Sequence, residues 1–192
     1  MNRNSILKLV TSGLLIAIGI VIPMFSPIKI VLEPASFTLA SHVTIFIAMA
    51  ISPGVAVAVA LGTAVGFFLG GFPIVIVLRA TSHFVFAFIG AMWLRKIPEE
   101  LRKGLKFRLF SLVIGLIHAF CELVVVTLFY FGGGVGAMYY QQGFVLSVLL
   151  LVGLGTVVHS MIDFEIAQKV MIPLRSSIAS LATPAKNQSA RL

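Results

Sequence analysis

The amino-acid sequence predicts an all-α integral membrane protein with about six transmembrane helices and both termini in the cytoplasm. Its 192 residues are 59% hydrophobic and only 10% charged, whereas about a quarter of the residues in a soluble domain are charged. The apolar residues fall into several long runs, and a helix that crosses a bilayer needs roughly 20 of them. We therefore expect one transmembrane domain over residues 1–192, with no room for a soluble domain.

Prolines, glycines and charges separate the expected helices. The breaks are a loop over 25–37, turns at 52–54 and 70–73, a charged segment over 95–108, and a polar, glycine-rich loop over 132–143. The expected spans cover residues 6–24, 38–51, 55–69, 74–94, 109–131 and 144–172, and a polar cytoplasmic tail follows over 176–192. The second and third helices are short, which is compatible with a tilted or partly re-entrant path.

The basic residues predict the orientation of these spans. With a cytoplasmic N-terminus, Lys29 is the one basic residue in an outer loop and Arg79 is the one within a span. Because orientation follows the lysines and arginines of short loops, both termini are expected inside. The residues on the cytoplasmic side are then Arg3, Lys8, Arg95, Lys96, Arg102, Lys103, Lys106, Arg108, Lys169, Arg175, Lys186 and Arg191.

Several functions are disfavoured by the composition. The net charge of +8 does not indicate nucleic-acid binding, because the basic residues sit at helix ends without an interleaved aromatic pattern. Cys121 is the single cysteine, and no cysteine–histidine spacing suggests a metal site. The four histidines lie on four different helices, and no two share a helix face. We therefore expect no metal and no cofactor.

Ionisable side chains inside the spans are the first candidates for binding a substrate, because a charge in lipid needs a partner or a function. Arg79 lies about two turns from the outer end of its helix, and His83 lies one turn deeper on the same face. Glu122 lies at a similar depth on the next helix, with His118 four residues before it. These residues indicate a structural ion pair, a polar substrate pocket open to the outside, or both.

The outer loop over 132–143 offers a second set of candidates. Tyr139, Tyr140 and Gln141 could close over a small ligand, with rings supplying contact area and the amide supplying hydrogen bonds. A plain solvated loop is the alternative.

The remaining polar residues of the spans are expected to be structural. His159 and Asp163 share a face near the inner end of the last helix, where local hydrogen bonding accounts for them. Helical spacing is expected to put His159 well away from Glu122. His42 is expected to be a packing histidine.

Small residues on the first helix form a candidate docking face. Gly13 and Ala17 lie four residues apart, and small residues let helix backbones approach closely in lipid. Packing within the protein and docking onto another membrane protein both fit this pattern. The denser series of alanines and glycines over 56–66 is typical of packing inside the protein.

Together these features resemble the substrate-binding S components of energy-coupling factor (ECF) vitamin transporters. The resemblance covers about residues 5–175. It is carried locally by residues 12–20 (SGLLIAIGI), 34–42 (PASFTLASH) and 72–80 (FPIVIVLRA).

The resemblance implies a binding subunit of a bacterial plasma-membrane importer, without enzymatic activity of its own. Family members bind one vitamin near the outer face and work with a transmembrane coupling subunit and two cytoplasmic ATPase subunits. This sequence has no P-loop, so its partners must hydrolyse the ATP. The family docks through an alanine-xxx-alanine motif, in which Gly13 replaces the first alanine and Ala17 matches the second.

The vitamin is not fixed by the resemblance, because members share a fold and differ in their pockets. Arg79 favours a carboxylate, since a guanidinium pairs with one through two parallel hydrogen bonds. That points to nicotinate (niacin) or pantothenate, and the segments 34–42 and 72–80 favour nicotinate. A pyridoxine- or hydroxymethylpyrimidine-type vitamin is the alternative.

Two other classes of function are alternatives. A stand-alone secondary transporter usually has two related halves, and no internal repeat is visible in the sequence. A small intramembrane enzyme using Glu122, His118 or His159 would need acid and base groups that converge at one depth.

Overall fold

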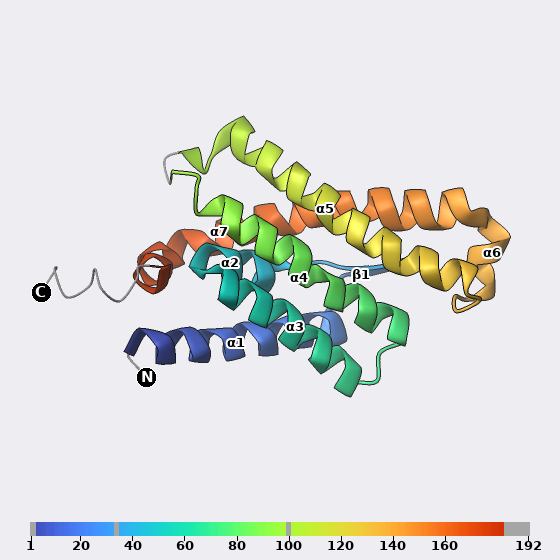
Figure 1. Ribbon diagram of the computed structural model, residues 1–192, viewed down its shortest axis with the longest axis horizontal. Coiled ribbons are helices and arrows are strands. Elements are labelled where there is room, and N and C mark those ends of the chain that lie inside the picture. Colours follow the sequence, from blue (N-terminus) through green and yellow to red (C-terminus); the bar gives the residue numbers. More distant parts are fainter. Residues whose placement is uncertain (1–2, 33–34, 99–100, 183–192) are drawn as a thin grey trace, which may run out of the picture.

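The computed structural model describes residues 3–32, 35–98 and 101–182, and these form an elongated bundle of helices with one small hairpin (Figure 1). The helices are α1 (Arg3–Phe25), α2 (Val43–Ile51), α3 (Pro53–Leu69), α4 (Ile74–Leu94), α5 (Gly104–Phe131), α6 (Ala137–Phe144) and α7 (Gly155–Ala182). A π-helical segment, η2 (Val145–Leu154), joins α6 to α7, and the strands are β1 (Lys29–Leu32) and β2 (Ala35–Thr38).

The predicted all-α membrane class is confirmed. Among the described residues, four helical stretches are long and apolar enough to cross a bilayer, namely α1, α4, α5 and the run over 137–182. The apolar helix α3 is shorter, at 17 residues. Both ends of the described chain lie at one end of the bundle, together with the α4–α5 connection, while α6 lies at the other end (Figure 1).

The region between α1 and α2 differs from the expected loop followed by a helix from residue 38. β1 and β2 pair antiparallel, with Lys29 opposite Thr38 and Leu32 opposite Ala35. The expected breaker Pro34 lies outside the described residues. Residues 39–42 form a turn, so α2 begins only at Val43.

The second half of the chain is more helical than expected. α5 begins at Gly104, five residues before the predicted start, and the predicted loop over 132–143 contains most of α6. Gly143 adopts φ 77°, a conformation that glycine tolerates without steric cost, and it kinks the chain just before the end of α6. α7 continues to Ala182, through the first part of the predicted tail, and Lys186 and Arg191 lie outside the described residues.

Small residues on α3 allow α1 to pack closely against it, as the sequence predicted. A Cβ atom on Gly62 would lie 2.5 Å from Ile16 Cδ1, and Gly66 is covered in the same way by Ile20. Gly13, on another face of α1, has no atom within 4 Å of such a Cβ. α1 therefore has one packed face and one open face.

Candidate functional site

A cavity of about 120 Å³ lies between the hairpin and the helices of the bundle. Its lining residues come from α1, α2, α3, α4, α5 and α7 as well as from the hairpin, so the wall joins segments far apart in the sequence. The polar lining residues are Lys29, Thr38, Ser41, His42, Thr63, Arg79, His83, Glu122, Thr156 and His159.

A buried carboxylate, Glu122, organises one side of this cavity. Its Oε2 accepts hydrogen bonds from Arg79 Nη2 at 2.8 Å and from Thr156 Oγ1 at 2.6 Å. Its Oε1 lies 3.2 Å from His83 Nε2 and 3.5 Å from His118 Nε2. All five side chains are buried. The predicted ion pair is therefore present, and the structure brings together the four residues of the first candidate set.

A second buried carboxylate, Asp163, holds the turn at residues 39–42, which contributes Ser41 and His42 to the cavity lining. Its Oδ1 accepts from the backbone N–H of Ala40 at 2.7 Å, and its Oδ2 accepts from the backbone N–H of His42 at 2.9 Å. His42 Nδ1 also lies 3.1 Å from Oδ2, and Ser41 Oγ lies 3.0 Å from His159 Nε2. These bonds hold Ala40 at φ 69°, a region that costs a non-glycine residue roughly 1–2 kcal/mol.

The expected distance between His159 and Glu122 is wrong, because both residues line one cavity. Thr156 bonds to Glu122, and His159 lies about one turn further along the same face of α7. That expectation assumed the spacing of a regular α-helix, whereas the chain before α7 passes through the π-helical η2, whose turns contain more residues. The two carboxylate networks therefore adjoin.

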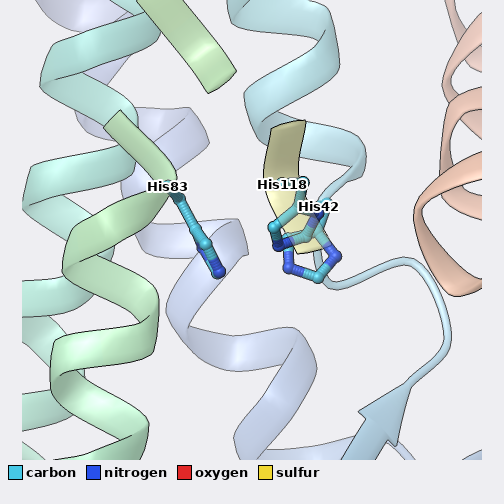
Figure 2. Close-up of side chains that lie close together, drawn as sticks. All are labelled: His42, His83 and His118. Carbon is cyan, nitrogen blue, oxygen red and sulfur yellow. The ribbon is translucent and has the colours of Figure 1, made fainter. Parts of the chain in front are cut away.

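The histidines meet although they come from four separate elements. The ring of His42 lies 4.8 Å from that of His83, 4.6 Å from that of His118 and 5.0 Å from that of His159, centre to centre. Figure 2 shows the three side chains pointing toward one another, with His42 at the start of α2, His83 on α4 and His118 on α5. His42 is thus part of a polar cluster and is more than a packing residue.

The candidates of the second set do not line this cavity. Tyr139 is buried in an apolar cluster with Val126, Val148 and Val152. The hydroxyl of Tyr140 donates to the carbonyl of Tyr130 at 3.0 Å, and Gln141 is exposed. These side chains belong to α6, which packs on α5 and η2 instead of closing over the cavity.

Several lining residues were missed by sequence reasoning. Lys29 was interpreted only as an outer-loop charge, although a single basic residue among uncharged outer segments was a usable signal. Thr63 and Thr156 carried no sequence signal that separates them from other threonines of a membrane helix. The aromatic wall from Phe67 and Phe72, whose rings stack at 4.7 Å, was equally hidden.

Comparison with known proteins identifies the family. No protein-family model matches the sequence. The chain is 42% identical over 165 residues to the niacin transporter NiaX of Lactococcus lactis subsp. cremoris (strain MG1363), a match that covers 86% of this chain and 73% of the relative. The chain belongs to the S components of ECF vitamin transporters. No solved structure matches it.

The family assignment confirms the resemblance drawn from the sequence and makes this S component a multi-pass membrane transport protein. Its cavity is then the natural place to look for the ligand site, since small-molecule sites are concave and lined by apolar walls with a few polar groups.

The Asp163 network leads to a prediction about stability. Asp163→Ala should lower the free energy of unfolding by about 3 kcal/mol, because buried backbone N–H groups lose charged acceptors. The matched control is Glu165→Ala, two residues further along α7. Glu165 lies 3.8 Å from Arg108 in a pair whose side chains are 48% and 72% exposed, so its loss should cost less than about 1 kcal/mol.

The measurement is thermal unfolding of the two purified variants in detergent, followed by the fluorescence of Trp93. Equal shifts of the two midpoints would contradict the structural role of Asp163.

Proposed function

We propose that this chain is the niacin-binding S component of an ECF-type importer, and that nicotinate binds in the cavity between Arg79 and the hairpin. The observation that carries this proposal is Arg79 itself, a cation 7% exposed that lines the cavity. The 42% identity to a niacin transporter supports the choice of vitamin. A small cavity also favours a single aromatic ring over the longer pantothenate.

Arg79 keeps donors for a ligand after its bond to Glu122. Nη2 is used by Glu122, whereas Nε is buried and has no hydrogen-bond partner among the described residues. An unsatisfied buried donor costs about 1–3 kcal/mol, and a carboxylate would satisfy it. A pyridine carboxylate also has an apolar ring, for which Phe67, Phe72 and Ile76 provide a wall.

The charges of the site require a second cation when the carboxylate enters. Arg79 and Glu122 form a pair, and the ligand adds one negative charge. Lys29, which is exposed, lines the same cavity from strand β1. We assign it the role of attracting the anion at the entrance, where a long flexible ammonium group can follow the ligand.

The role of Arg79 predicts a selective loss of binding. Arg79→Ala should weaken nicotinate binding at least ~100-fold, or ~2.7 kcal/mol, because the carboxylate loses its buried cation. Nicotinamide should bind poorly to the wild type and lose much less on mutation. Calorimetric titration of both ligands into both proteins measures this difference.

A double variant separates loss of binding from loss of folding. Arg79→Ala leaves Glu122 buried without its cation, which is destabilising, whereas Arg79→Ala with Glu122→Gln leaves a neutral pair of residues. The double variant should be folded and should also bind nicotinate weakly. Equal losses for acid and amide would mean that Arg79 only holds the helices together.

We further propose six spans with both termini in the cytoplasm of a bacterial plasma membrane. α2 and α3 supply the two crossings beyond the four long helical stretches, and the hairpin with the turn at residues 39–42 completes the crossing of the short α2. Both ends of the described chain lie at the same end of the bundle as the basic α4–α5 connection, which supports this topology (Figure 1).

Reporter fusions test the topology. Fusions at residue 102 and at the C-terminus should both report the cytoplasm, and a fusion at Gly133 should report the outside. The opposite result at any of the three positions would contradict the six-span arrangement.

The partners we propose are the ECF transmembrane coupling subunit and two cytoplasmic ATPase subunits. The open face of α1 is the docking site for the coupling subunit, because Gly13 and Ala17 are both exposed on it. Close approach of helix backbones at small residues is a main source of association in lipid. Another face of α1 packs on α3 through Ile16 and Ile20 and holds the helix in place.

Bulk on this face should separate binding from transport. Gly13→Leu and Ala17→Leu should abolish nicotinate uptake by the assembled transporter, because a larger side chain holds the partner helix away. Nicotinate binding by the isolated protein should stay within twofold, since the cavity lies elsewhere. The matched control is Ala58→Leu at an exposed position of α3, which should retain uptake. Uptake that survives Gly13→Leu with Ala17→Leu would exclude this docking face.

A further inference from the structure

We propose that His42, His83 and His118 bind one divalent transition-metal ion, with Zn²⁺ as the reference ion, at the inner wall of the cavity. Each of the three residues offers a ring nitrogen, and these atoms lie within 4.8 Å of one another. All three histidines are buried, and His118 is fully buried. The proposal goes beyond vitamin binding and does not depend on it.

The spacing of the rings suits a shared ion. Zinc lies about 2.0–2.1 Å from a histidine nitrogen and is usually tetrahedral, which puts the centres of three bound imidazole rings about 5 Å apart. The observed ring centres are 4.8, 4.6 and 4.6 Å apart. The three side chains converge in Figure 2, and small rotations of the rings would bring their nitrogens to ligand spacing.

A carboxylate lies beside each of the three histidines, as is usual for metal-binding histidines. Metal ligands almost always use their other ring nitrogen to bind a carboxylate or carbonyl, which fixes the ring. His42 Nδ1 lies 3.1 Å from Asp163, while His83 Nε2 and His118 Nε2 lie 3.2 and 3.5 Å from Glu122 Oε1. Each ring has a second nitrogen besides the one nearest its carboxylate.

Unsatisfied atoms point to a missing ligand at this place. Both ring nitrogens of His118 are buried and have no hydrogen-bond partner among the described residues. Leaving such a group unpaired costs about 1–3 kcal/mol, and a bond to the ion would satisfy it. His42 and His83 line the cavity, whereas His118 lies behind them. A fourth coordination position would therefore face the cavity.

The charges around the histidines favour a cation. With imidazoles counted as neutral, Glu122 and Asp163 contribute two negative charges and Arg79 one positive charge. The cluster is negative by one unit before an ion binds. Three imidazole ligands suit zinc, copper, nickel or cobalt better than magnesium or calcium, which prefer oxygen.

The neighbouring group of His42, His159 and Asp163 also has ligand atoms within 4.8 Å. It is a poorer site, because both Asp163 oxygens accept backbone hydrogen bonds and His159 Nε2 is bonded to Ser41 Oγ at 3.0 Å. An ion there would have to break the bonds that shape the turn at residues 39–42. His159 is therefore the matched control within the same cavity.

The experiment is titration of ZnCl₂ into the full chain, purified in detergent without a polyhistidine tag and treated with a chelator. Calorimetry should show one ion per chain with micromolar or tighter affinity. His83→Gln and His118→Gln should each weaken binding at least 30-fold, and His159→Gln should change it less than threefold. Thermal unfolding of each variant verifies that it is folded.

A second readout uses Co²⁺ as the probe. The wild type and His159→Gln should give the visible absorption of four-coordinate Co²⁺ with nitrogen ligands, and His83→Gln should not. The proposal is overturned if the wild type binds no stoichiometric ion, if His118→Gln keeps full affinity, or if His159→Gln loses as much as the other two variants.

Discussion

The buried carboxylate of Glu122 is the interaction on which the rest of the structure depends. It joins three helices, since Arg79 belongs to α4, Glu122 to α5 and Thr156 to α7. In lipid no hydrophobic drive holds helices together, so a pair of opposite charges inside the bundle specifies how they meet. Removing one partner would leave a buried charge uncompensated, which costs about 3–5 kcal/mol.

Asp163 ties the start of α2 to α7, as Glu122 ties α5 to α4 and α7. It fixes the turn before α2 through backbone N–H groups and thereby turns His42 toward the ring cluster. α1 stands outside both networks and is held by aliphatic packing on the glycines of α3. Under the proposed function, ligand binding and partner docking therefore use different parts of the protein. The polar centre binds the ligand, and the open face of α1 contacts the partner.

Local signals predicted much of the fold. α4 begins and ends at the predicted residues because Pro73 and Arg95 interrupt the apolar run on both sides. The pairing of Arg79 with Glu122 followed from equal depth on adjacent helices. In contrast, nothing in the sequence separates the positive φ of Ala40 from ordinary helix, because a distant carboxylate stabilises that conformation. The convergence of the four histidines was also missed. They lie on separate elements that meet only in the fold, whereas metal-ligand spacing along a single helix is visible in a sequence.

The charges of the cavity connect the vitamin to the histidines. Glu122 and Asp163 outweigh Arg79 by one negative charge, so a carboxylate that enters meets a site already biased against it. Lys29 compensates for this at the hairpin, where it is exposed, and exposed charges are screened and contribute little to final affinity. A divalent ion on His42, His83 and His118 would instead leave the buried site at plus one, and one bound carboxylate would bring it to neutrality. On this reasoning the two cations act at different stages. Lys29 acts while the anion approaches, and the ion acts once the anion is bound away from water.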